Sequence, residues 1–83
     1  MKVSERLEAH GLLELVQTVA HAHGATLAEV CGRARTRGVS AARFACYRAL
    51  YYHPVFAFSS VEIGRLFGRD HSSILNGIKG RLR

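Results

Sequence analysis

The spacing of the apolar residues limits the possible folds of this chain more than any other feature. Apolar side chains recur at helical intervals, as at Leu12, Val16 and Val19, and no alternating stretch is long enough for a strand. A chain of 83 residues, 48% of them apolar, has enough apolar side chains for one small core. We therefore predict an all-α fold, a small bundle of about five helices in a single domain over residues 1–83.

Two capping boxes mark helix starts. Thr26 is followed three residues later by Glu29, and Ser59 is followed in the same way by Glu62. Each pair can satisfy free backbone N–H groups at a helix start. The predicted helices span residues 4–23, 27–31, 41–52, 60–67 and 71–82.

Single residues set the other predicted boundaries. Ser40 and Asp70 can cap the third and the last helix. Pro54 stops the third helix, and Gly68 supplies the terminus of the fourth. Gly11 marks a weak point, or a start, within the first helix.

Charge is distributed unevenly along the chain. Twelve Lys and Arg oppose six Asp and Glu, which gives a formal net charge of +6 and a pI near 10.2. Residues 1–29 carry a net charge of −2 and residues 30–83 carry +8. This asymmetry indicates a polyanionic partner, most commonly nucleic acid, although a solvated Arg-rich surface would give the same count.

The last two predicted helices have the spacing of a helix-turn-helix, over about residues 60–82, in which the second helix enters the major groove. On a helical projection of residues 71–82, one face is small, hydrogen-bonding or cationic. It consists of Ser72, Ser73, Asn76, Lys79 and Gly80, opposite a stripe of Leu75, Ile78 and Leu82. We predict that this face reads DNA; the alternative is a merely solvated surface.

A second basic feature is the segment 33–37, which lies between two glycines. Arg33, Arg35 and Arg37 alternate there, so they cannot line one face of a helix. Such a loop can reach into a narrow minor groove, whose negative potential attracts guanidinium groups. The alternative is an unbound surface loop.

The run Phe67-Gly68-Arg69-Asp70-His71-Ser72-Ser73-Ile74-Leu75, preceded by Glu62-Ile63-Gly64, resembles the signature of the DnaA family of bacterial chromosomal replication initiators. The similarity is to the C-terminal DNA-binding domain, domain IV, and extends to residues 15–20 and 27–30. It implies a Trp-repressor-like helical bundle. Within the signature, the chain departs from the family pattern in two ways: one glycine stands where two are usual, and Ser72-Ser73 replaces a pair of threonines.

The resemblance also implies a function. That domain binds double-stranded DNA at the nine-base DnaA box, with the helix-turn-helix in the major groove and an arginine in the adjacent minor groove. Arg35 matches the minor-groove arginine, Arg33 and Arg37 match basic neighbours, and Arg43 matches an arginine that contacts phosphate or base edges. Arg69 matches a backbone-contacting arginine. The residues that match base readers are Asp70, His71, Ser72 and Ser73, and we add Asn76 and Lys79 from the helical projection.

The segment Tyr51–Phe58 is more aromatic than its counterpart in the family. It could form a surface for a protein partner, as in a helical adaptor with only nonspecific DNA affinity. Its alternative, which we favour, is local core packing around Pro54.

Other function classes lack their motifs. No GxxxxGK[ST] occurs, so we expect no nucleotide bound by this chain and a stand-alone or excised domain rather than a complete initiator. His21 and His23 face different directions on a helix, and Cys31 and Cys46 form no CxxC, so we expect no catalytic site, metal or cofactor. Without an apolar run of membrane-spanning length, we expect a cytoplasmic, nucleoid-associated protein that contacts no membrane.

Overall fold

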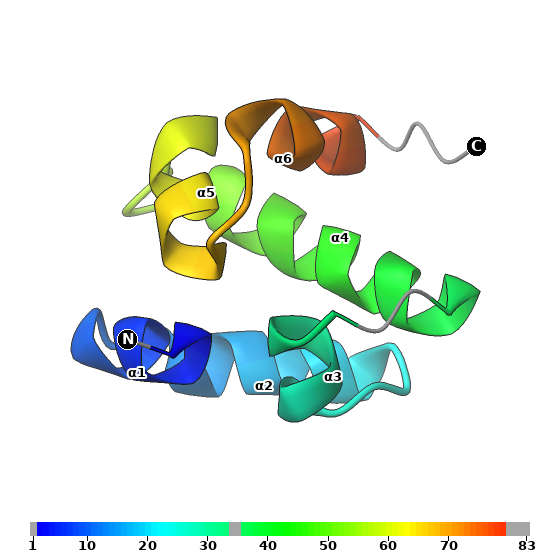
Figure 1. Ribbon diagram of the computed structural model, residues 1–83. Helices are drawn as coiled ribbons and strands as arrows, with labels where there is room; N and C mark the ends of the chain where they lie inside the picture. The colour runs from blue at the N-terminus through cyan, green and yellow to red at the C-terminus, as the bar shows by residue number, and fades with distance from the viewer. Residues whose placement is uncertain (1, 34–35, 80–83) are drawn as a thin grey trace.

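Six helices make up the secondary structure that the computed structural model describes, over residues 2–33 and 36–79, and no strand lies within these residues (Figure 1). The helices are α1 (Val3–Ala9), α2 (Leu13–Ala22), α3 (Leu27–Cys31), α4 (Arg37–Tyr51), α5 (Ser60–Phe67) and α6 (His71–Ile78). The long α4 lies between α1, α2 and α3 on one side and α5 and α6 on the other (Figure 1), and α2, α3, α5 and α6 pack against it. The predicted all-α class is confirmed. None of the helices in the described residues is long and apolar enough to cross a membrane.

The prediction of one helix over residues 4–23 was wrong, because two helices occupy this part of the chain. Gly11 has a φ of 70°, in the left-handed region that glycine adopts without strain. The amide of Leu12 then donates to the carbonyl of Leu7 at 2.8 Å, and both leucines are buried. The tight turn lets α1 and α2 cover different parts of the core.

Helices α3 and α5 have the predicted boundaries, and both capping boxes are formed. Thr26 Oγ1 accepts from the amide of Glu29 at 3.1 Å, and Glu29 Oε1 accepts from the amide of Thr26 at 2.9 Å. Ser59 and Glu62 repeat this exchange at 3.1 and 2.9 Å. Gly68, with a φ of 66°, ends α5 as predicted.

Helix α4 begins one turn earlier than predicted. Thr36, rather than Ser40, is its N-cap, and Thr36 Oγ1 accepts from the amide of Val39 at 3.3 Å. Both residues can cap a helix, and the earlier start buries Val39. Arg37 therefore belongs to the first turn of α4 rather than to a loop.

The core is centred on α4. Cys46 and Leu50 are fully buried there and belong to one cluster with Val16, Ile63 and Ile74 from α2, α5 and α6. The ring of Tyr47 meets that of Phe67 edge to face, with centroids 5.0 Å apart. These contacts join the helix-turn-helix to the rest of the molecule.

The buried stripe of α6 differs from the predicted one. Ile74, Gly77 and Ile78 are buried, Leu75 is half-buried, and Leu82 lies outside the described residues. A Cβ atom on Gly77 would lie 2.5 Å from the ring of Phe44 on α4. This close approach accounts for a glycine inside a helix, which costs about 1 kcal/mol relative to alanine.

Alkaline pH should destabilise the fold through Cys46. Burial raises the pKa of its thiol from 9.0 to about 12, and the thiol donates to the carbonyl of Val16 at 3.6 Å. The thiol ionises more readily in the unfolded chain than in the folded protein. Its contribution to the free energy of unfolding is therefore complete at a pH below its pKa in the unfolded chain, and is lost as the pH rises toward its pKa in the folded protein. We expect a loss of about 1 kcal/mol of unfolding free energy at pH 10. Denaturation at pH 7 and pH 10 should show a smaller loss in Cys46→Ala; an equal loss in both proteins would contradict this.

Candidate nucleic-acid interface

The turn between α5 and α6 is tightly packed. The amide of Arg69 donates to the carbonyl of Gly64 at 2.8 Å. A Cβ atom on Gly64 would lie only 2.6 Å from the carbonyl oxygen of Arg69, so this position has no room for a side chain. Asp70 then caps α6, with Oδ2 accepting from the amide of Ser72 at 3.0 Å. These contacts fix the direction in which α6 leaves the turn.

The outer face of α6 is polar and exposed, and it carries the residues that the projection placed there. Four residues of the projected face are exposed: Ser72, Ser73, Asn76 and Lys79. His71 is exposed as well, at the start of α6, although its helical position is nearer to the buried side of Ile74. Gly80, the last member of the predicted face, lies outside the described residues. The side chains of Asp70 and His71 are 68% and 55% exposed, with His71 Nδ1 3.9 Å from Asp70 Oδ1. All of these groups can reach a ligand without rearrangement of the core.

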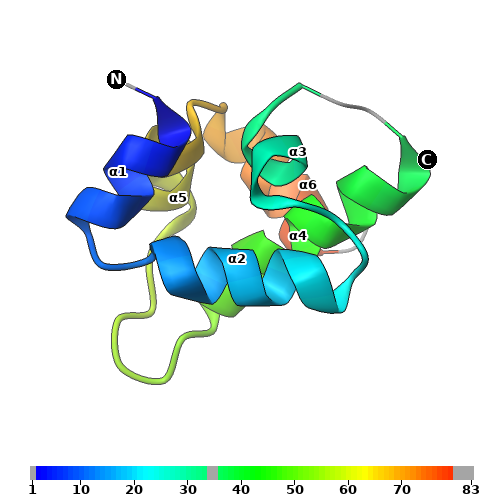
Figure 2. The ribbon, with the colours of Figure 1, turned by 90° about the horizontal axis from the view of Figure 1, so that it is seen from below.

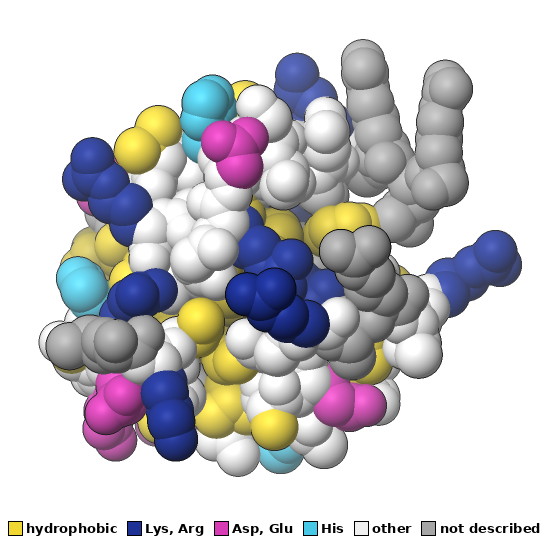
Figure 3. Space-filling view, viewed as in Figure 1, with side chains coloured by type: hydrophobic (Ala, Val, Ile, Leu, Met, Phe, Trp, Pro, Cys, Tyr) yellow, Lys and Arg dark blue, Asp and Glu magenta, His cyan; other side chains and the backbone are white. Residues whose placement is uncertain are grey.

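The basic segment begins beside this turn. Arg33 and Arg37 are exposed, and Arg35 lies outside the described residues. Lys and Arg side chains gather in the middle of the face shown in Figure 3, between the part formed by α5 and α6 and the part formed by α1 and α3. A hollow of about 330 Å³ lies here and is lined by Arg33, Gly68 and Arg69 among others. The face thus combines a polar helix with a cationic hollow.

Arg43 has a different position from the one that the resemblance implied. It is 6% exposed, and its guanidinium donates to the carbonyls of Val30, Glu29 and Gly32 at 3.0, 3.0 and 3.1 Å. Burial lowers the pKa of the Arg43 guanidinium. The nearby Tyr47 raises this pKa in part, and the nearby Arg69 lowers it further. The last carbonyls of a helix lack partners within it, and α3 has no basic residue in its last turn. Arg43 fills this role from α4, and its contact with DNA stays a prediction.

Arg69 also has a partner within the protein. Its Nη2 donates to the carbonyl of Gly32 at 2.9 Å, and the residue is half-buried. The resemblance implied a contact with the DNA backbone. The observed contact instead joins the helix-turn-helix to the residue that precedes the basic segment.

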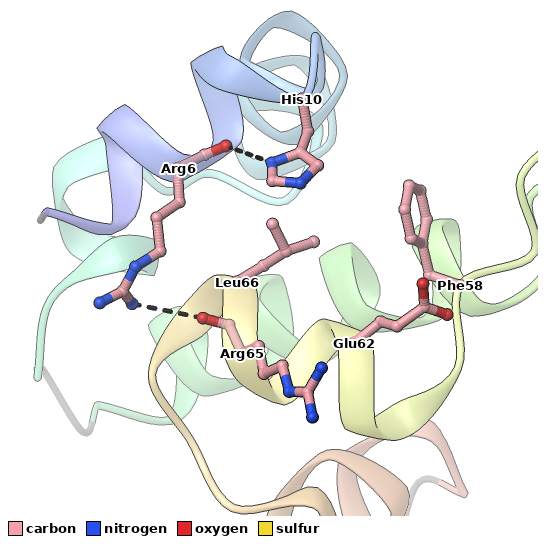
Figure 4. A pocket seen from close by; sticks show the side chains of 6 residues that line it. All are labelled: Arg6, His10, Phe58, Glu62, Arg65 and Leu66. Carbon is pink, nitrogen blue, oxygen red and sulfur yellow. Dashed lines mark hydrogen bonds between the residues drawn. The ribbon is translucent and has the colours of Figure 1, made fainter.

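Sequence reasoning missed two further arginines whose side chains donate to carbonyls near helix ends. Arg6 Nη1 donates to the carbonyl of Arg65 near the end of α5, and Arg48 Nη1 donates to that of Gly77 near the end of α6, both at 3.3 Å. Figure 4 shows Arg6 reaching toward the carbonyl of Arg65, and both residues line a cavity of about 360 Å³ together with His10 and Leu66. For Arg48 the sequence signal was the absence of a basic residue in the last turn of α6; for Arg6 there was no such signal, because α5 has Arg65 in its last turn.

The aromatic segment is more exposed than predicted. Tyr51 and Phe58 pack against the core, but Tyr52, Val55 and Phe56 are 67%, 76% and 60% exposed. The predicted packing around Pro54 is therefore wrong for these three side chains. Two amides of the segment, those of Val55 and Phe56, donate to the ring of His53, so the turn is held by local hydrogen bonds. In Figure 2 the α4–α5 connection projects on the side of the molecule away from α3.

A family model described as the bacterial dnaA protein helix-turn-helix matches residues 13–80. The chain belongs to this family. No solved structure gives a significant match to this chain. The family binds double-stranded DNA, and a role in replication initiation fits it. In DnaA, domain IV is a DNA-binding domain rather than a catalytic one. Within residues 2–33 and 36–79, no group of three or more His, Cys, Asp or Glu side chains is placed to hold a metal ion.

Proposed function

We propose that this protein, as a single unit over residues 1–83, binds duplex DNA sequence-specifically at DnaA-box-like sites, in replication initiation or its regulation. The observation that carries the proposal is the exposed polar face of α6 beside the basic segment on one side of the molecule. The recognition helix, within residues 71–82, enters the major groove, and residues 33–37 follow the adjacent minor groove. This function places the protein at the nucleoid in the cytoplasm.

The side chains of α6 suit base edges in the major groove. The carboxylate of Asp70 accepts from cytosine N4, and the His71 ring donates to guanine or adenine N7. Ser72 and Ser73 hydroxyls fit several edges, and the Asn76 amide can pair with adenine at N6 and N7. Serine has no methyl group for contact with the thymine C5-methyl, so we expect a preference different from that of family members with two threonines.

The cationic side chains provide affinity. Lys79 lies on the exposed side of α6, where it can meet a phosphate. Arg33 and Arg37 flank the minor-groove arginine, Arg35, and contribute to phosphate or groove contacts. Phosphate contacts release counterions, so affinity falls as the salt concentration rises.

Fluorescence anisotropy of a labelled duplex tests the proposal. The protein is titrated against a DnaA-box nonamer duplex and a scrambled duplex at two salt concentrations. We expect at least tenfold tighter binding to the box, about 1.4 kcal/mol, at both concentrations. Equal, steeply salt-sensitive binding would overturn sequence specificity, and no binding to either duplex would overturn the proposed function.

Two variants separate base reading from phosphate contact. The double variant Ser72→Ala with Ser73→Ala should reduce the preference for the box by about 1 kcal/mol and leave the salt dependence unchanged. Lys79→Ala should weaken binding to both duplexes alike and reduce the slope of log K against log salt by about one unit. A serine double variant with full preference for the box would show that this face does not read bases.

A second candidate function is protein binding through the exposed part of the aromatic segment, Tyr52, Val55 and Phe56. Three exposed apolar side chains within five residues of the chain favour this interpretation. The double variant Tyr52→Ser with Phe56→Ser should keep wild-type DNA affinity within about twofold, because this surface faces away from the DNA. Anisotropy checks this, and a loss as large as that of Lys79→Ala would place the segment in the DNA interface instead.

A further inference from the structure

One backbone oxygen, that of Gly32, receives hydrogen bonds from two arginines. Arg69 Nη2 lies 2.9 Å from it and Arg43 Nη2 lies 3.1 Å from it. A carbonyl oxygen has two lone pairs and can accept both. Gly32 ends α3 and directly precedes Arg33, so these bonds hold the point from which the basic segment starts.

The two arginines come from different parts of the fold. Arg43 lies on α4 and is buried under the end of α3, whereas Arg69 lies in the turn of the helix-turn-helix, 37 residues beyond Gly32. Arg69 is therefore a direct link between the two elements that the proposed function assigns to the major and minor grooves.

Both ends of this link lie in closely packed backbone. The amide of Arg69 is bonded to Gly64, and its carbonyl is too close to Gly64 for a Cβ atom there. A Cβ atom on Gly32 would lie 2.9 Å from the carbonyl oxygen of Ala28. The hydrogen bond therefore joins two closely packed parts of the backbone.

We propose that Arg69 is a positioning residue that holds Gly32 and Arg33, where the basic segment starts, close to the start of α6, so that the two grooves are read in register. The inference rests on the proposed function. Reading two adjacent grooves requires both elements to be held close to their bound geometry, and a preformed arrangement avoids the cost of ordering them on binding. Loss of the link therefore lowers discrimination between sequences rather than the number of phosphate contacts.

Limited trypsin digestion tests the link without DNA. Arg69→Ala retains the cleavage sites at Arg33, Arg35 and Arg37, and cleavage after Arg48 within α4 reports global unfolding. We expect the rate of cleavage in segment 33–37, relative to that after Arg48, to rise at least threefold over the wild type. Arg65→Ala is the matched control, because it removes one exposed arginine from α5 and leaves the Gly32 contact in place. An unchanged ratio, or the same rise in the control, would overturn the proposal. Arg69→Gln, which keeps a polar side chain at the turn, gives the same test if the alanine variant does not fold.

DNA titrations distinguish positioning from direct phosphate contact. For Arg69→Ala we expect the preference for the box over the scrambled duplex to fall at least fivefold, with the salt slope of the wild type. Equal weakening on both duplexes with a slope lower by about one unit would identify Arg69 as a phosphate ligand and overturn the positioning role. A wild-type protein that fails to discriminate between duplexes would overturn the proposed function, whereas the trypsin result would stand independently.

Discussion

Replacing Arg43 with methionine should lower the free energy of unfolding by about 3 kcal/mol, because three charge-assisted hydrogen bonds to carbonyls at the end of α3 are lost. Methionine fills a similar length with an apolar chain, so most of the loss reflects the lost hydrogen bonds rather than a cavity. Urea denaturation followed by circular dichroism measures the change.

Arg48→Met is the matched control for this variant. Arg48 also lies on α4 and donates to one carbonyl, that of Gly77, but it is half-buried. We expect a loss of about 1 kcal/mol there. Equal losses in the two variants would show that the Arg43 contacts add nothing beyond those of an ordinary half-buried arginine.

Gly64→Ala should destabilise the fold by about 2 kcal/mol, because the added methyl group would meet the carbonyl oxygen of Arg69. The clash is with backbone, so the turn before α6 has to move. The better helix propensity of alanine, about 1 kcal/mol, offsets only part of the cost. Thermal and urea unfolding measure the change.

Gly38→Ala is the control, because a Cβ atom there meets nothing within 4 Å and Gly38 lies in the first turn of α4. This variant should be slightly more stable than the wild type, since alanine restricts the unfolded chain. If both glycine variants were stabilised, the close approach at Gly64 would be contradicted.

Local signals in the sequence determined the elements that were predicted correctly. Thr26 with Glu29, and Ser59 with Glu62, form caps from residues three apart, so α3 and α5 could be placed without knowledge of the rest of the fold. The start of α4 was misplaced because Thr36 and Ser40 are both adequate caps locally. Packing of Val39 against the interior favours the earlier one, and this packing is not visible from local sequence.

The candidate site likewise has one part that the local sequence predicted and one part that it did not. The exposed face of α6 followed from helical periodicity, because the side opposite the core has to be exposed. The roles of Arg43 and Arg69 could not be predicted, since their acceptors lie 11 to 37 residues away in the chain. An arginine that bonds to a distant carbonyl has the same local sequence as one that meets a phosphate.

The arginines on the helix ends also give a reason for the composition of the chain, which has ten arginines and only two lysines. Among the arginines that the structure describes, Arg6, Arg43, Arg48 and Arg69 donate to carbonyls of other elements near the ends of α3, α5 and α6. A guanidinium offers five donors in a fixed plane, whereas an ammonium is a compact point charge. Gradual exchange of arginine for lysine, which conserves net charge, would therefore erode the architecture of this protein while leaving its overall electrostatic attraction to DNA almost the same. A homologous sequence could therefore keep the same net charge and still lose stability, if lysine replaced the arginines that bond to helix ends.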